Sequence, residues 1–218
     1  MIHLTAADGH RLQAYEAMPA GAARGGVVVV QEIFGVNDHI RRVADGYAAD
    51  GYRVIAPALF DRVRPGIELG YTDADIAEGR KIRGQLTFEQ ALADVEAARK
   101  ALGAGNIGIV GYCWGGTVTW LSSARLQGFA AAASYYGGGI GQFAAEHPRC
   151  PTQCHFGERD HAIPLTEVTA VRDANPAVEV YTYAAGHGFN CDARASYDAA
   201  AAKLARERTL AFFRKHIG

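Results

Sequence analysis

Apolar segments rich in β-branched residues alternate along this chain with segments of helical periodicity. The run GGVVVVQEIFG at 25–35 is continuously apolar at its centre, which is typical of a strand buried on both faces of a parallel sheet. The next segment, DHIRRVADGYAADG, has the 3.6-residue repeat of an amphipathic helix and reaches a stop signal at Gly51. Together the two segments predict a strand–helix unit.

The same alternation continues to the end of the sequence. We predict further strands at 52–60, 106–112, 129–139, 152–158 and 178–183, and helices at 86–103, 114–128, 164–174 and 193–216. The opening segment, 3–17, is typical of an antiparallel hairpin that turns at Asp8-Gly9. This pattern predicts an α/β fold over residues 1–218, a single three-layer domain with a mostly parallel central sheet.

The charge and hydropathy of the chain argue against two classes of partner, nucleic acids and membranes. The 22 basic and 23 acidic residues nearly balance, so neither a nucleic acid nor an acidic membrane surface is an expected partner. The first residues lack a basic region followed by an apolar core, and no apolar run is long enough to span a bilayer. We therefore expect a cytoplasmic protein, a monomer or a small homo-oligomer, with reduced cysteines.

The sequence predicts neither a metal nor an organic cofactor. Cys150, Cys154 and His155 lie close together, but CPTQC is not a Cys-x-x-Cys knuckle and no second pair follows at zinc-finger spacing. Cys154 falls within a predicted strand, which favours a core position. The GGGIG run at 137–141 lacks the Lys-Ser/Thr of a phosphate loop, so we interpret it as a flexible connection.

Chemically useful side chains follow several of the predicted strands. Glu32, Cys113, Asp160 and His187 each come just after a strand. In an open parallel sheet the reactive site lies outside the carboxyl ends of the strands, so these residues are the first candidates for a site.

Cys113 lies in the segment GYCWGG, between a predicted strand and a predicted helix. A sharp strand-to-helix turn holds its central residue in strained backbone and leaves no room for neighbouring Cβ atoms, which explains Gly111 and Gly115. The helix N-terminus would stabilise a thiolate and later an oxyanion. The alternative is a small core residue beside a tight turn.

A thiol nucleophile needs a base, and the base needs a group that orients it. His187 lies in a glycine-flanked loop after the last strand, and Asp160 precedes it by one helix and one strand. This nucleophile–acid–histidine order is that of α/β-hydrolase triads. Glu158 and His161 compete with Asp160 for the role, and a surface histidine or an ordinary turn aspartate is the simpler alternative.

The segments GYCWGG, FGERDHAIP, GHGFN and VVVVQEIFG together resemble the dienelactone hydrolase (carboxymethylenebutenolidase) family of α/β hydrolases with a Cys-His-Asp triad. The resemblance covers essentially the whole chain. It implies hydrolysis of a small ester or enol lactone through a cysteinyl acyl intermediate, without a cofactor. Cys113 would be the nucleophile, His187 the general base and acid, and Asp160 the residue that orients the imidazole.

The resemblance also implies roles for the residues around the nucleophile. The backbone N–H groups of Ile33 and Trp114 would form the oxyanion hole. Glu32 would pair with Cys113 and help control its ionisation, either by like-charge repulsion or by taking the thiol proton. Alternatively, Glu32 only anchors its loop through backbone hydrogen bonds.

Substrate recognition departs from the family pattern. The family binds the lactone carboxylate with arginines, one of them four residues after the catalytic histidine, where this chain has Cys191. The nearest arginine is Arg194. A second cation is expected in the helical insert at 71–86, where the candidates are Arg80, Lys81 and Arg83. A solvated helix face is the alternative for these charges.

Aromatic residues and the insert complete the candidate pocket. Phe34, Tyr135 and Tyr136 follow strands on the same side of the sheet, although core packing is equally compatible with the tyrosines. Residues 61–85 could form a lid. Three functions follow: hydrolysis of an unsaturated lactone, hydrolysis of a neutral ester or a thioester with the same triad, and a non-catalytic thiol sensor in which Cys113 is oxidised reversibly.

Overall fold

All eight strands form one sheet in the computed structural model, which describes residues 1–103 and 105–218. The strands lie in the order β1-β2-β4-β3-β5-β6-β7-β8. β1 pairs antiparallel with β2, β2 pairs antiparallel with β4, and the remaining neighbours are parallel. The bounds are Ile2–Thr5, Arg11–Ala17, Gly26–Val30, Arg53–Pro57, Ile107–Tyr112, Ala131–Tyr135, Thr152–Gly157 and Glu179–Tyr183 for β1 to β8. The predicted mostly parallel sheet and its N-terminal hairpin are confirmed.

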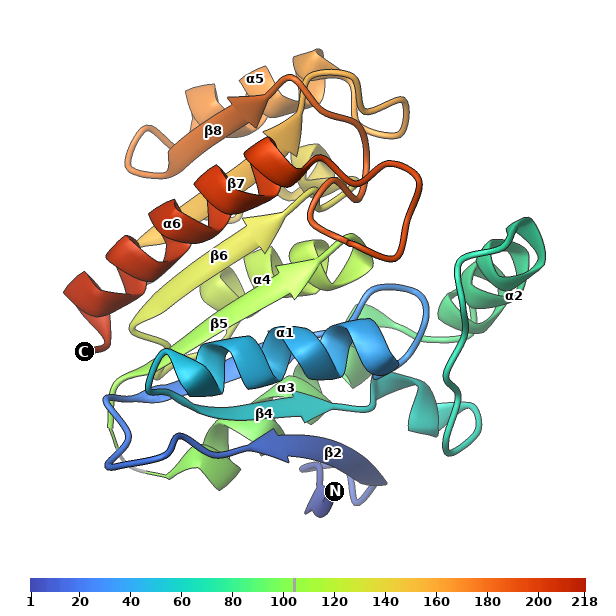
Figure 1. Cartoon of the computed structure of the whole chain (residues 1–218), viewed down its shortest axis with the longest axis vertical. Helices are drawn as coiled ribbons and strands as arrows, with labels where there is room; N and C mark the ends of the chain where they lie inside the picture. The colour runs from blue at the N-terminus through green and yellow to red at the C-terminus, as the bar shows by residue number, and fades with distance from the viewer. Residues whose placement is uncertain (104) are drawn as a thin grey trace.

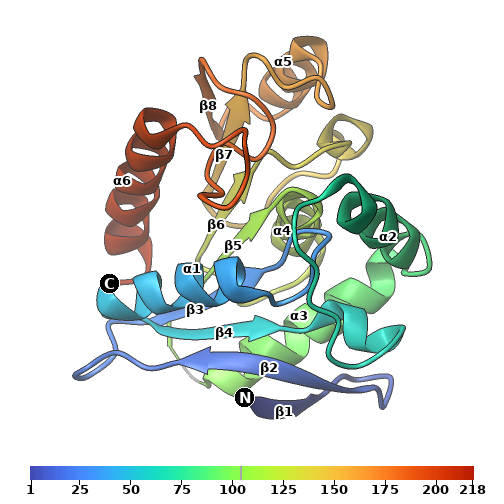
Figure 2. The ribbon, with the colours of Figure 1, turned by 45° about the vertical axis from the view of Figure 1, so that its right-hand side comes forward.

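Helices cover both faces of this sheet, as Figures 1 and 2 show. One face carries α1 (Asp38–Ala49) and α6 (Ala199–His216), and the other carries α3 (Phe88–Leu102), α4 (Trp114–Arg125) and α5 (Leu165–Ala174). α2 (Asp73–Arg83) lies apart from these layers, beyond the carboxyl ends of the central strands. The predicted α/β class with three layers is therefore confirmed.

The central strands of the sheet are buried on both faces. Every residue of β3 and β5 is buried, which accounts for the continuous apolar runs in their sequences. Tyr47 of α1 and Phe213 of α6 belong to one buried apolar cluster, while Val95 of α3 and Val118 of α4 belong to a second. This packing holds the carboxyl ends of the central strands in fixed positions.

Several predicted boundaries were wrong, among them those of the strand predicted at 129–139, which spans Ala131–Tyr135. The strand predicted at 52–60 ends at Pro57, and a 3₁₀ helix follows at Leu59–Arg62. The last helix begins at Ala199 and not at 193, because Asp198 caps it by accepting a hydrogen bond from the Ala201 N–H at 2.9 Å. Residues 193–198 are thus available to form part of the site. None of the helices in the described part of the chain has the length and apolar character needed to cross a bilayer.

Candidate active site

Cys113 occupies the turn between β5 and α4 in a strained backbone conformation, with φ 55° and ψ −121°. The flanking glycines are sterically required. A Cβ atom on Gly115 would lie 2.5 Å from the Val30 carbonyl oxygen, and one on Gly111 would collide with the Gly115 carbonyl. The tight turn predicted from GYCWGG is therefore present, with the thiol at the carboxyl end of a central strand.

His187 and Asp160 lie beside this thiol. His187 Nε2 is 3.2 Å from Cys113 Sγ, and His187 Nδ1 is 2.7 Å from Asp160 Oδ2. The Asp160 side chain is fully buried, and its other oxygen accepts a hydrogen bond from the Ala162 N–H at 2.8 Å. The structure thus brings together, in one hydrogen-bonded row, three residues that are 27 and 47 positions apart in the sequence.

The charge balance of this row favours a protonated imidazole. Burial alone would lower the pKa of His187, but the neighbouring Cys113 sulfur and the Asp160 carboxylate outweigh it and raise this pKa to about 10. A protonated His187 can donate a hydrogen bond from Nε2 to the Cys113 sulfur 3.2 Å away. The arrangement can therefore present a nucleophile and a proton donor at adjacent atoms.

The two predicted oxyanion-hole residues follow neighbouring parallel strands, Ile33 after β3 and Trp114 after β5. Trp114 is the first residue of α4, so its N–H has no acceptor within the helix. Ile33 lies in the turn after β3, and Gly79 of α2 packs so closely on the Ile33 carbonyl that a Cβ atom there would collide with it. The helical insert thereby rests on the loop that carries Ile33.

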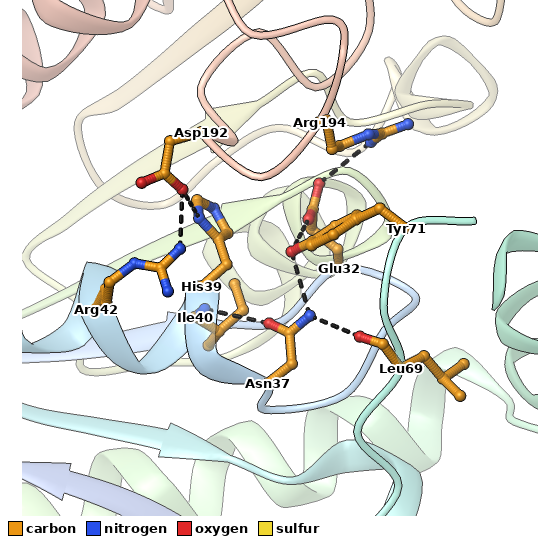
Figure 3. A network of polar contacts seen from close by, with 9 residues as sticks. All are labelled: Glu32, Asn37, His39, Ile40, Arg42, Leu69, Tyr71, Asp192 and Arg194. Carbon is orange, nitrogen blue, oxygen red and sulfur yellow. Dashed lines mark hydrogen bonds and ion pairs between the residues drawn. The ribbon is translucent and has the colours of Figure 1, made fainter.

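Glu32 is fully buried. Its carboxylate lies 3.5 Å from Arg194 Nη1 and 3.5 Å from the Tyr71 hydroxyl, which also accepts a hydrogen bond from Asn37 Nδ2 at 3.1 Å (Figure 3). Among the described residues, no hydrogen bond joins Glu32 to Cys113, and none joins its side chain to the backbone. Sequence reasoning missed Asn37 and Tyr71, which carry no motif of their own.

Several cations line a pocket beside the imidazole. A cavity of about 560 Å³ is bounded by His187, Arg80, Arg159, His161 and Arg194, among others. Arg83, a further candidate, lies instead over the rings of Phe88 and Trp114, with its guanidinium carbon 5.1 and 5.9 Å from the ring centroids. Arg159 and His161 follow β7 in the same loop as Asp160, so their position after a strand was the signal that could have identified them.

Two of the three aromatic candidates, Tyr136 and Phe34, are buried side chains that support other residues of the site. The Tyr136 ring packs edge-on against His187 with centroids 5.2 Å apart, and its backbone has φ 38°. The Phe34 ring lies 4.6 Å from the Tyr71 ring, and the Arg194 guanidinium is 5.8 Å from its centroid. Their burial, 0 % and 1 % exposed, makes them walls of the site.

Cys154 and His155 belong to the core. Both lie in β7 and are fully buried, as predicted for Cys154, and burial raises the pKa of Cys154 to about 12. Burial, helped by Arg208, lowers the pKa of His155 to about 3. His155 Nδ1 hydrogen-bonds with the Tyr183 hydroxyl at 2.8 Å and Nε2 with the Thr209 hydroxyl at 3.2 Å. With both ring nitrogens occupied, His155 has no lone pair left for a metal.

The sequence profile of the dienelactone hydrolase family matches residues 12–217. The chain belongs to the dienelactone hydrolase family. It is 34% identical over 224 residues to the carboxymethylenebutenolidase of Pseudomonas putida, covering 97% of this chain and 94% of the other. It is 37% identical over 212 residues to a candidate carboxymethylenebutenolidase of Synechocystis sp., with coverage of 88% and 86%. A solved structure of a candidate dienelactone hydrolase from Klebsiella pneumoniae superposes with a TM-score of 0.86 at 31% identity, over 99% of each chain.

Membership in this family of hydrolases makes the chain an ester-hydrolysing enzyme. The residue at position 191 differs from the family pattern. Where the family pattern places an arginine four residues after the histidine, this dienelactone hydrolase family member has Cys191, fully buried and with its pKa raised to about 11 by burial. Arg194 reaches the site instead. Its guanidinium lies against Gly188, where a Cβ atom would be 2.5 Å from Arg194 Nη1, and Gly188 has φ 77°. Glycine is thus needed there for both backbone and space.

Proposed function

We propose that this enzyme hydrolyses a small enol lactone that carries a carboxylate, through an acyl intermediate on Cys113. The row of Cys113, His187 and Asp160, with contacts of 3.2 and 2.7 Å, is the observation that carries the proposal. A thiolate, a proton donor and a fixed carboxylate are the groups that acyl transfer requires.

In the proposed acylation step, the Cys113 sulfur attacks the lactone carbonyl carbon. The carbonyl oxygen becomes negatively charged and is received by the N–H groups of Trp114 and Ile33. When the tetrahedral intermediate collapses, the ring C–O bond breaks and the enolate oxygen takes a proton from His187. The product of this step is a thioester whose acyl chain still carries the released enol.

In the proposed deacylation step, water replaces the ring oxygen. His187, now neutral, takes a proton from the water as its oxygen attacks the thioester carbonyl. Asp160 holds the imidazole so that Nε2 faces the water, and stabilises the imidazolium that forms. Collapse expels the Cys113 thiolate, which restores the starting pair with protonated His187 and releases the open carboxylic acid.

The basic pocket favours an anionic substrate. Arg80, Arg159 and Arg194 line the cavity that borders His187, and a guanidinium binds a carboxylate through paired hydrogen bonds. One observation points the other way, toward a neutral ester: Arg194 is already paired with Glu32. The two substrates can be separated experimentally.

The test is ultraviolet-monitored hydrolysis of a carboxylated dienelactone beside its methyl ester, with Cys113→Ala as the blank and Cys150→Ser as the matched cysteine control. We expect the acid to be preferred, Cys150→Ser to behave as wild type, and acid-quenched enzyme to show the mass of one ring-opened lactone on the Cys113 peptide. Turnover by Cys113→Ala at the wild-type rate would exclude the acyl-cysteine route. Preference for the methyl ester would establish the neutral-ester alternative, and reversible oxidation of Cys113 without turnover of either compound would favour the thiol sensor.

A further inference from the structure

Three buried side chains with different ligand atoms converge next to the catalytic turn. A carboxylate oxygen of Glu32, a ring nitrogen of His39 and the sulfur of Cys191 all lie within 4.8 Å of one another. The residues come from the turn after β3, from the first turn of α1 and from the loop after β8. Their exposed fractions are 0 %, 4 % and 0 %, so the cluster is shielded from solvent.

The hydrogen bonds around His39 leave one of its nitrogens free to act as a ligand. His39 Nδ1 lies 3.1 Å from Asp192 Oδ1, which also accepts a hydrogen bond from Arg42 at 3.0 Å (Figure 3). Because an ionised carboxylate can only accept, Nδ1 carries the proton in the neutral ring and Nε2 carries a lone pair. Within the described part of the chain, His39 Nε2 has no hydrogen-bond partner although it is buried.

The hydrogen-bonding capacity of the Glu32 carboxylate is also not fully satisfied among the described residues. Its Oε1 atom has no hydrogen-bond partner among the described residues, and only the guanidinium of Arg194, 3.5 Å away, faces it. Leaving a buried carboxylate oxygen and a buried imidazole nitrogen without partners is costly. One ligand that accepts electron pairs from both atoms and from the adjacent sulfur would relieve both deficits.

We propose that Glu32, His39 and Cys191 form a binding site for a thiophilic divalent cation of the zinc class. The cation displaces the thiol proton of Cys191, which is released to solvent. Thiolate sulfur and imidazole nitrogen select such a cation over magnesium or calcium, which prefer oxygen ligands. The Asp192–His39 contact is the carboxylate–histidine pairing that orients ligating imidazoles. Three protein ligands leave the fourth tetrahedral position for water or another small ligand.

Two adjustments accompany binding. Ligand atoms around a tetrahedral zinc ion lie roughly 3.5 Å apart. The three ligand atoms now lie within 4.8 Å of one another, so they must approach by at most about 1 Å. The cation also competes with the Arg194 guanidinium for Glu32 Oε1, since both are positive. Removing the guanidinium with Arg194→Met should therefore tighten cation binding, whereas a purely structural Glu32–Arg194 pair predicts no such gain.

The experiment is a titration with Co²⁺, a spectroscopic substitute for Zn²⁺, on Cys113→Ser protein, in which the catalytic thiol cannot contribute. We expect one equivalent to bind with a thiolate-to-metal charge-transfer band, and Zn²⁺ to displace it. In the same background, Cys191→Ser should remove the band, and Asp192→Asn should weaken binding by about 10- to 100-fold. Cys150→Ser is the matched control and should leave the spectrum unchanged.

The proposal fails if no charge-transfer band forms, or if the band persists in the Cys191→Ser protein. If circular dichroism shows that this buried substitution prevents folding, Asp192→Asn decides, because its side chain is 53% exposed and the fold should tolerate the exchange. Unchanged Co²⁺ affinity in Asp192→Asn would then overturn the site. These readouts do not depend on ester turnover, so their failure is distinct from failure of the proposed hydrolysis.

Discussion

Replacing Asp160 with asparagine tests the proposed relay at the residue farthest from the reacting atoms. The exchange keeps the size of the side chain and removes only its charge. One oxygen remains to accept the Ala162 N–H, now 2.8 Å from Oδ1, so the loop is expected to keep its conformation. When the amide oxygen keeps the Ala162 N–H, the atom that faces His187 Nδ1 at 2.7 Å changes from a charged acceptor to an N–H donor; when the amide is reversed, that atom is a neutral oxygen.

The expected loss has two parts. A charge-assisted hydrogen bond of this kind is worth roughly 1.5–3 kcal/mol, which corresponds to about 10- to 100-fold in rate. If the asparagine instead presents its N–H, the imidazole adopts the other tautomer and Nε2 can no longer accept a proton. In serine-hydrolase triads the same exchange costs about 10,000-fold. We therefore expect kcat/KM for Asp160→Asn to fall by about 100- to 10,000-fold.

The assay is lactone or ester hydrolysis with circular dichroism as a check on folding, and Asp173→Asn on the exposed side of α5 is the matched control. The pKa of His187, followed by nuclear magnetic resonance, should also fall from about 10, since Asp160 is one of the two groups that raise it. A folded Asp160→Asn enzyme with kcat/KM within about threefold of wild type would refute the proposed relay.

Three further substitutions test the turn, the nucleophile and the buried core. Cys113→Ser should fold normally but lose nearly all ester turnover, because a hydroxyl is far less acidic than a thiol; wild-type rates would contradict thiolate catalysis. Gly115→Ala should lower the free energy of unfolding by about 1–3 kcal/mol in urea titrations, because its Cβ meets Val30, whereas Gly21→Ala has nothing within 4 Å and should be neutral. His155 has its pKa lowered from 6.5 to about 3, so the unfolded chain binds a proton first as the pH falls below 6.5 and stability is lost toward pH 3. His155→Gln should reduce the loss in the free energy of unfolding between pH 6.5 and about 4 by roughly 3 kcal/mol. An unchanged dependence of this free energy on pH would show that His155 does not titrate in this way.

The positions of the three relay residues could be predicted because the fold repeats one rule. Cys113, Asp160 and His187 follow parallel strands, and the carboxyl ends of parallel strands lie at one edge of the sheet. GYCWGG added local evidence, since glycines at 111 and 115 relieve clashes that the tight turn creates. Strand periodicity and turn sterics therefore located the site without information on side-chain packing.

The contacts of Glu32 could not be predicted in the same way. Its partners Arg194 and Tyr71 come from a loop and from the insert before α2, and neither segment has a periodic pattern that fixes its path. Alanine-rich sequence also concealed the start of the last helix, so 193–198 was assigned to a helix. That error mattered, because a helix beginning at 193 would not have placed Arg194 in the turns that lead back to Glu32.

The loop after β8 shows how an exchanged residue can alter two properties of the site at once. Backbone hydrogen bonds from Cys191 to Gly188 and from Arg194 to Cys191 fold the loop back on itself, so residues three positions apart stay close to the site. An arginine at 191 would place a cation in the buried space that the Cys191 sulfur now shares with Glu32 and His39. With cysteine there, Arg194 supplies positive charge from the outer side of Glu32, against Gly188. Cysteine in place of arginine at 191 therefore leaves Arg194 as the expected carboxylate anchor. It also leaves sulfur, nitrogen and oxygen atoms together in the buried space, so substrate charge and cation binding must be tested with separate variants.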